Sequence, residues 1–410
     1  MEYRERMPEE RFHGRAALMS VLAAAAVMAA AVAGCSDDPT AANAPVVSLP
    51  LVTLATHDTT IIATGSSTFM QRVVTNGAAN LVGHAGRYTA MSLIQFLSTG
   101  FPNRDTAVVF SATLQIKFVS WFGDSTGRLA FNIYRIMLPW TNYLTTWDTV
   151  QAPGFYEQYI SRGSYSGGAG PDTQTVTIPL DTAMVRQWLA TPTTTNTNVK
   201  YGILLVPASG CTMIRGFNEN GYPLDSTSWY PTVTIIAGSP AGSPRDTASY
   251  TASYNTWVGN AENLPANPQL IYLQSGINYN ATLSFNVGFV PRSAVINQAT
   301  LLLTLDPASS YFNRYATDSS FTLGATTSPS DRSQVDPYAT SSTRVPGAPL
   351  TWAVDMTRPV QIWNRSPNYG VTLKPSVSLD AVSFELMAFF NEQAAPALRP
   401  RLKIKYSIVR

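Results

Sequence analysis

Apolar and polar residues alternate along much of this chain, as they do in half-buried β-strands. The clearest run, from Ala112 to Phe118, places apolar side chains at every second position. The only stretches with helical spacing, Asp181 to Ala190 and Met356 to Asn364, are each about two turns long. Further alternating runs, separated by proline and glycine clusters, are Leu129 to Tyr134, Thr175 to Leu180, Val233 to Ile235 and Leu402 to Tyr406. The pattern therefore predicts an all-β fold.

Five segments recur in the same order in the two halves of the chain, which indicates an internal repeat. Each half has an alternating strand, a short Thr-x-x-Val-x-x-Trp helix, a Tyr-Gly step into a strand, a Phe-Asn-Glu segment and a closing Pro-initiated strand. We expect the helix threonine to cap its helix and the tryptophans to pack on the sheet. The matched segments are 111–116 with 298–303, 182–188 with 357–363, 201–205 with 369–373, 217–219 with 390–392, and 231–235 with 400–404.

Composition divides the chain into five parts. Residues 35–51 are rich in Ala, Pro, Ser and Thr and predict a tether. The repeated Gly-Ser-Pro within 238–248 predicts a linker. We therefore expect a signal peptide at 1–34, the tether, a first β domain at 52–237, the linker, and a second β domain at 249–410.

The N-terminal residues have the pattern of a secretory signal. Arg4, Arg6, Arg11 and Arg15 precede an uncharged apolar stretch, and small residues lead up to Cys35. This pattern resembles the bacterial lipobox and predicts a diacylglycerol on Cys35. The alternatives are an ordinary signal peptide and a transmembrane anchor, although an alanine-rich span is weakly hydrophobic for a membrane helix. The expected location is the cell envelope, with the lipid in the outer membrane or at the cell surface.

The charge content limits the kinds of molecule that this chain is expected to bind, and the cysteine content limits the disulfides that it is expected to form. Charged residues make up 13 % of the chain, about half the average for proteins, and the net charge is +2. This balance gives no electrostatic argument for nucleic acid. With Cys35 acylated, Cys211 has no partner for a disulfide, and we expect it to be a small buried hydrophobic residue.

Each repeat resembles the DNRLRE domain, a bacterial extracellular β-sandwich of jelly-roll type. This family is similar to some carbohydrate-binding modules and to the propeptide fold of transforming growth factor beta. The first repeat departs from the family pattern at Leu180, where the family has an acid, and the second has no counterpart of Trp140 and Thr146-Trp147. The matching residues are Leu93–Phe96, Ser111–Leu114, Trp140 with Thr146-Trp147, Thr182–Trp188, Tyr201-Gly202, Phe217–Glu219 and Pro231–Ile235, then Asp355 and Arg399-Pro400 in the second repeat. The resemblance implies two tandem jelly-roll domains, each with one short helix, that bind surface partners without catalysis.

Catalytic and metal-binding motifs are weak in this sequence. His57 and His84 have no ligand or triad spacing, so we expect structural roles for both. Glu219 and Glu392 occupy equivalent places in the repeats, but a glycosidase needs two carboxylates in one site. We therefore predict no enzyme activity. Calcium is the one cofactor that the residues suggest, with hard oxygen ligands from Asn218, Glu219, Asn220 and Asp225.

Aromatic residues in one Gly/Ser-rich loop are the better binding signal. The loop from Phe155 to Asp172 belongs to the first repeat alone and has no clear strand pattern. Its tyrosines can stack on sugar rings, or they can cover the edge of the sandwich. The predicted ligand-binding residues are Tyr156, Glu157, Tyr159, Arg162 and Tyr165.

Three functions compete at this point. The first is a non-catalytic surface lipoprotein that binds extracellular polysaccharide or matrix. The second is a structural or adhesive protein that binds another surface protein, by strand addition at a sheet edge for example. The third, a glycoside hydrolase or lyase, is the least supported.

Overall fold

In a computed structural model of the chain, the described residues form an all-β fold with three short helices. The structure describes residues 54–72, 74–75, 79–96, 106–168, 170–171, 173–190, 201–218, 230–239, 245–264, 266–312, 320–376 and 384–409. Residues 54–410 form one compact unit.

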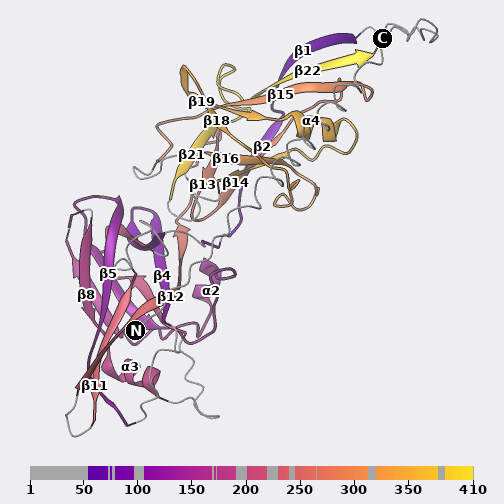
Figure 1. The fold of residues 1–410 in the computed structure, drawn as a ribbon. Coiled ribbons are helices and arrows are strands. Elements are labelled where there is room, and N and C mark those ends of the chain that lie inside the picture. Colours follow the sequence, from indigo (N-terminus) through magenta and orange to yellow (C-terminus); the bar gives the residue numbers. More distant parts are fainter. Residues whose placement is uncertain are drawn as a thin grey trace, which may run out of the picture. The chain divides into compact units, whose positions relative to one another are not determined.

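The first half of this unit contains the strands β1 to β11 and two helices (Figure 1). The elements are β1 (Leu54–Ile62), β2 (Gly65–Met70), β3 (Ala79–Ala85), β4 (Tyr88–Phe96), β5 (Val108–Gly123), β6 (Leu129–Arg135), α2 (Trp147–Gln151), β7 (Gly163–Gly167), β8 (Gln174–Pro179), α3 (Thr182–Leu189), β9 (Ile203–Pro207), β10 (Met213–Asn218) and β11 (Thr232–Gly238).

The second half contains ten more strands after β12 and one helix. The elements are β12 (Arg245–Ala261), β13 (Leu270–Gln274), β14 (Tyr279–Ser284), β15 (Val295–Thr304), β16 (Phe321–Ala325), β17 (Thr340–Ser341), β18 (Thr343–Val345), β19 (Ala348–Asp355), α4 (Thr357–Trp363), β20 (Val371–Pro375), β21 (Leu386–Phe390) and β22 (Arg401–Val409).

The first sandwich is built from strands in the order β12-β11-β5-β10-β3-β4-β9-β6-β7, with β8 paired to β5 and β12 also paired to β4. Alternating residues of β5 enter its core, including Leu114, Ile116 and Phe118. Helix α3 closes one end of this core with Val185 and Trp188. The predicted strands and the predicted helix in this half are confirmed.

The second sandwich packs a five-stranded sheet against a seven-stranded one. The first has the order β1-β22-β15-β19-β18 and the second β17-β16-β20-β14-β13-β21, with β2 paired to β14. Leu301, Phe321, Trp352 and Phe389 lie in the core between these sheets, and Trp363 of α4 packs against the same core.

Strand pairing follows the internal repeat closely. In the first sandwich β5 pairs with β11, and in the second β15 pairs with β22, which is the equivalent pair of segments. Likewise β9 lies between β4 and β6, and β20 lies between β14 and β16. Helices α3 and α4 each follow the strand that pairs with β5 or with β15. The two halves therefore share these strand pairings, with one difference: β10 also pairs with β5, which joins the first half into one ten-stranded sheet, whereas the second half has two sheets.

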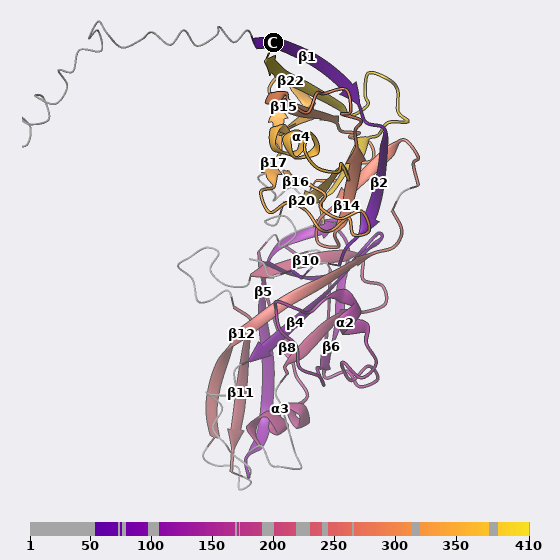
Figure 2. The ribbon, with the colours of Figure 1, turned by 90° about the vertical axis from the view of Figure 1, so that its right-hand side faces the viewer.

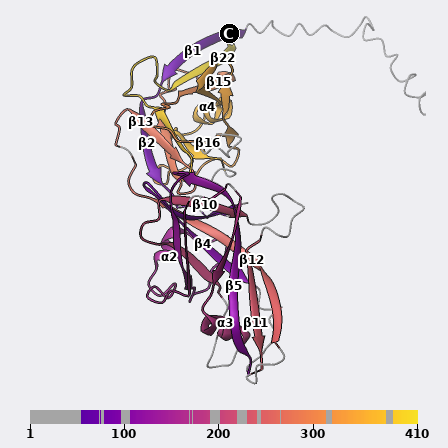
Figure 3. The same ribbon diagram turned by 90° about the vertical axis from the view of Figure 1, so that its left-hand side faces the viewer.

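The first strand of each repeat lies in the sandwich of the other repeat. Strand β12, which begins the second repeat, pairs with β11 and β4 of the first (Figure 3). Strands β1 and β2, which begin the first repeat, pair with β22 and β14 of the second (Figure 2). The two repeats thus exchange their opening strands.

Because of this exchange, the observed strand pairing does not follow the expected division into domains at 52–237 and 249–410. Residues 54–70 belong to the sheets of the C-terminal sandwich, whereas 249–261 belong to the N-terminal one. The Gly-Ser-Pro run lies between paired strands, because Gly238 of β11 is the register partner of Arg245 of β12. A sequence that breaks a strand suits a hairpin turn as well as a linker, which explains the difference.

The helix caps also differ from expectation. Asp181 precedes α3, and its carboxylate accepts a hydrogen bond from the backbone N–H of Ala183 at 2.8 Å. Helix α4 has Met356 at the N-cap, with no side-chain cap bond, and the Thr357 hydroxyl accepts from the backbone N–H of Ala299 at 3.0 Å. The prediction that threonine caps both helices is therefore wrong: Asp181 takes the N-cap position of α3, and at α4 the Thr357 hydroxyl bonds instead to Ala299 and Asp355.

Candidate functional site

The segment from Ile136 to Arg162 is held to the end of β6 by backbone hydrogen bonds. Met137 N–H donates to the Phe155 carbonyl at 2.8 Å, and Glu157 N–H donates to the Arg135 carbonyl at 3.0 Å. Arg162 N–H donates to the Ile133 carbonyl at 2.7 Å. The segment therefore returns alongside the strand from which it departed and does not project freely.

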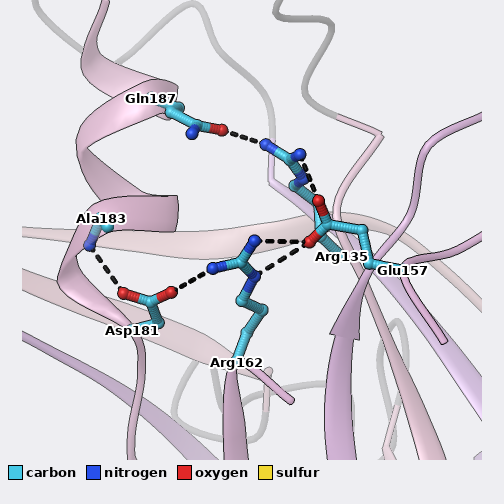
Figure 4. Close-up of polar contacts among 6 residues, drawn as sticks. All are labelled: Arg135, Glu157, Arg162, Asp181, Ala183 and Gln187. Atoms are coloured by element: carbon cyan, nitrogen blue, oxygen red, sulfur yellow. Dashed lines mark hydrogen bonds and ion pairs between the residues drawn. The ribbon is translucent and has the colours of Figure 1, made fainter. Parts of the chain in front are cut away.

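Four charged side chains connect this segment to β6 and α3 (Figure 4). Glu157 accepts from Arg135 through one carboxylate oxygen and from Arg162 at 2.8 Å through the other. Arg162 also donates to Asp181 at 2.5 Å. Arg135 donates further to the side-chain oxygen of Gln187 on α3. We call Arg135, Glu157, Arg162 and Asp181 the ion-pair network.

The network is mostly shielded from solvent, since its side chains are between 15 % and 28 % exposed. Burial by itself would raise the pKa of Asp181, but hydrogen bonds from Arg162 and the Ala183 backbone, with the Arg162 charge, lower that pKa overall. Burial would likewise lower the pKa of Arg162, and hydrogen bonds and charge from Glu157 and Asp181 raise it instead. Asp181 and Arg162 are therefore both ionised at neutral pH, and their pairing favours a structural role.

The predicted binding residues have unequal positions in the structure. Tyr156 is half-buried, and its ring lies 5.3 Å from that of Tyr134. Tyr165 lies on β7 and packs against Phe131 at 5.5 Å. Tyr159 is 95 % exposed. The loop expected to have no strand pattern therefore contains β7 and turns two of its three tyrosines toward the protein.

Glu157 and Arg162, the predicted hydrogen-bonding partners for sugar hydroxyls, point toward each other. Their polar atoms are engaged inside the ion-pair network, which leaves little capacity for a ligand. The structure therefore brings two of the five predicted residues into one cluster and leaves Tyr159 apart on the surface.

Sequence reasoning missed a set of exposed apolar side chains in the same segment. Asp148 and Glu157 are the only charged residues from Ile136 to Ser161, and this scarcity of charge was the available signal. We call the six exposed side chains the apolar loop set: Met137, Leu138, Tyr143, Leu144, Tyr159 and Ile160. Leu144 is 77 % exposed and Tyr143 69 %. Exposed apolar side chains gathered in one segment are typical of contact surfaces.

Buried aromatic residues support these loops from below. Trp140, Phe155 and Val150 pack with residues of β4 and β9 in one apolar cluster. Trp140 Nε1 donates to the Tyr201 carbonyl at 2.7 Å. Thr146 and Thr149 form a capping box at the start of α2. The segment therefore rests on a fixed base.

The other predicted sites are covered only in part. Asn218 ends β10, while Glu219, Asn220 and Asp225 lie outside the described residues, as does Cys35. In the described ranges, no group of three or more His, Cys, Asp and Glu side chains could hold a metal ion. Cys211 is buried, as predicted. Its thiol donates to the Met213 carbonyl at 3.2 Å.

The histidines have local contacts. His57 of β1 stacks on Tyr406 of β22 with the rings 5.1 Å apart, and His84 shares a hydrogen bond with the Thr89 hydroxyl at 3.0 Å. These contacts agree with the structural roles expected for both.

No family model matches the chain, and no curated protein matches it by sequence. The resemblance to the DNRLRE domain therefore stays a prediction. None of the helices in the described ranges combines the length and the hydropathy that crossing a bilayer requires.

Proposed function

We propose that this chain is a non-catalytic, extracytoplasmic binding protein that contacts another surface protein through the apolar loop set. The observation that carries the proposal is the exposure of these six large apolar side chains in one charge-poor segment. Protein contact surfaces combine aromatic and aliphatic anchors and are depleted in charge at their centre.

A protein partner fits these residues better than a polysaccharide. Four of the six side chains are aliphatic or Met, and such side chains offer no flat face to a sugar ring. Sugar recognition also needs free hydrogen-bonding groups near the stacking ring, and Glu157 and Arg162 are already bonded to each other. A polysaccharide remains the second candidate, because Tyr143 and Tyr159 are both strongly exposed.

The test compares the apolar loop set with exposed side chains elsewhere. In one variant Tyr143, Leu144, Tyr159 and Ile160 are replaced by Ser. In the matched control Tyr338 and Leu350, which are also exposed, are replaced by Ser. Cross-linked cell-envelope proteins and a polysaccharide array are probed with both variants and with wild type.

We expect the loop variant to lose one or more envelope proteins that wild type and control both capture. Loss of polysaccharide binding alone would favour the second candidate. Equal capture by all three forms, with unchanged circular dichroism spectra, would exclude the apolar loop set as the contact surface.

The same proposal includes attachment to the membrane through a lipid on Cys35. Eighteen residues lie between Cys35 and Leu54, so a tether of this length can span up to about 60 Å when extended. Such a tether lets the β-sandwiches reach partners beyond the membrane surface. We expect Cys35→Ser to move the protein from the detergent phase to the aqueous phase; a processed variant that stays in the detergent phase would contradict lipidation.

A further inference from the structure

In both sandwiches the exchanged segment pairs with two strands in the same way. We call the position between these two strands the slot: it is formed by β11 and β4 in the first sandwich, and by β22 and β14 in the second. In the first sandwich Thr232 of β11 pairs with Thr251 of β12. In the second sandwich the equivalent residue of β22, Arg401, pairs with Ile62 of β1. These pairs make Thr251 and Ile62 equivalent, with an offset of 189 residues.

The pairs on the other side of each slot give the same offset of 189 residues between the two exchanged segments. Ile94 of β4 and Leu283 of β14 are equivalent, because they pair with Ile203 and Val371, which match in the repeat. Ile94 pairs with Asn255 of β12, and Leu283 pairs with Ser66 of β2. Asn255 and Ser66 are again 189 residues apart. The 17 residues of β12 and residues 56–72, which include most of β1 and all of β2, are therefore equivalent occupants of equivalent slots.

The two occupants are held with different strength. Strand β12 inserts Trp257 and Val258 into apolar clusters, where both are almost fully buried. From 54 to 72 the one buried side chain is Ala63. Side chains of β1 alternate between exposed and half-buried positions. Ile61 touches the core and His57 stacks on Tyr406, so backbone pairing, with few buried side chains, is the main contribution that holds this segment.

The two exchanged segments also differ in how far along the chain they lie from the strands with which they pair. Strand β12 follows β11 directly and pairs with it as a hairpin. Thr56 of β1 and Ser407 of β22 touch through their hydroxyls at 3.2 Å, although 351 residues separate them. The C-terminal sandwich thus receives its opening strand from a distant part of the chain.

We propose that a second copy of this chain can supply β1 and β2 to the C-terminal sandwich. The pairing with β22 and β14 is the same whether the strands come from the same chain or from another one. Two copies that exchange their opening strands form a closed dimer with no new contact surface. This partner does not depend on the function proposed above.

Single cysteines in two chains test this exchange. One variant has Thr56→Cys and the other Ser407→Cys, each in the full chain with Cys35→Ser so that the lipid-bearing thiol is absent. The two variants are mixed over a range of protein concentrations in a thiol–disulfide buffer. We expect a disulfide-linked heterodimer at twice the monomer mass, with a yield that rises with concentration.

The equivalent slot of the first sandwich supplies a matched control. Thr234 of β11 and Ser249 of β12 touch through their hydroxyls at 2.9 Å. Chains with Thr234→Cys and Ser249→Cys, mixed in the same way, are expected to give little heterodimer, because these strands form a local hairpin.

A single chain that carries both Thr56→Cys and Ser407→Cys tests, at low protein concentration, whether the two positions lie close enough to form a disulfide. We expect an internal disulfide in this chain. If this bond forms while the mixed variants give no more heterodimer than the control mixture, the exchange between copies is overturned. If the internal bond does not form, the pairing of β1 with β22 is contradicted and the proposal fails with it.

Discussion

The carboxylate of Asp181 links helix α3 to Arg162, which lies just before β7. One of its oxygens accepts from the backbone of α3, and the other accepts from Arg162, which also contacts Glu157. A charge that serves two partners at once contributes to the positions of both. The ion-pair network therefore stabilises the base on which the apolar loop set lies.

Asp181→Asn is expected to destabilise the protein by about 1–2 kcal/mol at neutral pH, since the cap can remain while the charged pair with Arg162 is lost. The folded-state pKa of Asp181 is lowered, so its contribution is fully present above the unfolded pKa and is lost as pH falls through the folded value. The difference between wild type and variant should therefore shrink below about pH 4. Urea unfolding at several pH values measures it.

Asp148→Asn is the control for this prediction. Its carboxylate pairs with Arg72 at 3.0 Å but is 65 % exposed, and exposed ion pairs contribute little. We expect no clear change in the free energy of unfolding. A stability difference for Asp181→Asn that stays constant from pH 7 to pH 3 would contradict the role given to its ionised form.

At the level of single elements, α3 and α4 have the same place in the two sandwiches. Trp188 of α3 and Trp363 of α4 are both almost fully buried against the core of their own sandwich. In α3 the ring of Trp188 lies 6.1 Å from that of Phe96 on β4. Each helix therefore joins the two layers of its sandwich.

Trp188→Ala and Trp363→Ala are each expected to lower the free energy of unfolding by about 3–5 kcal/mol, because each leaves a cavity in a packed core. Chemical denaturation measures both changes. Tyr159→Ala is the control, since this side chain is exposed and its loss should leave stability unchanged. A stable Trp188→Ala protein would show that the tryptophan is not part of the core.

Sequence reasoning succeeded where the signal was local. The Thr-x-x-Val-x-x-Trp helices and the Tyr-Gly steps each lie within a few residues, so the repeat and the all-β class could be predicted. The exchange could not, because β1 and β22 meet through backbone pairing across almost the whole chain. Residues 56–72 and β12 share little sequence, so no repeated motif revealed that they occupy equivalent slots.

The sequence could indicate candidate binding residues, but it could not indicate which of them are exposed. The sequence marked Tyr156, Tyr159 and Tyr165 equally, whereas their exposure depends on how the segment pairs with β6 and packs on Tyr134 and Phe131. Tertiary packing of this kind has no local signature. The scarcity of charged residues from Ile136 to Ser161 was the more informative feature.

For the whole molecule, the exchange decides which fragments can fold. Residues 79–262 contain the first sandwich with β12, whereas residues 79–238 lack this strand. We expect the longer fragment to unfold cooperatively in urea. The shorter one should aggregate or bind a hydrophobic dye, since it leaves the edges of β4 and β11 unpaired and lacks Trp257.

Fragments with equal stability would contradict the place given to β12. The comparison is sensitive because the two fragments differ mainly by one strand and the turn before it. Trp257 also contacts Phe384 of the second half, with the rings 5.0 Å apart, so the longer fragment should be less stable than the full chain.

The pairing of Thr56 with Ser407 also sets an order of events during synthesis. Strand β1 is made well before its partner β22, because the paired residues Thr56 and Ser407 are 351 residues apart. At about 5–20 residues per second, this interval lasts roughly 20–70 s. Strand β2 pairs with β14, which is made earlier, and the first sandwich can close as soon as β12 is complete, while β1 still lacks its partner. A chain that stops before β22 therefore leaves β1 unpaired, so β1 can be covered from within only after β22 has been made.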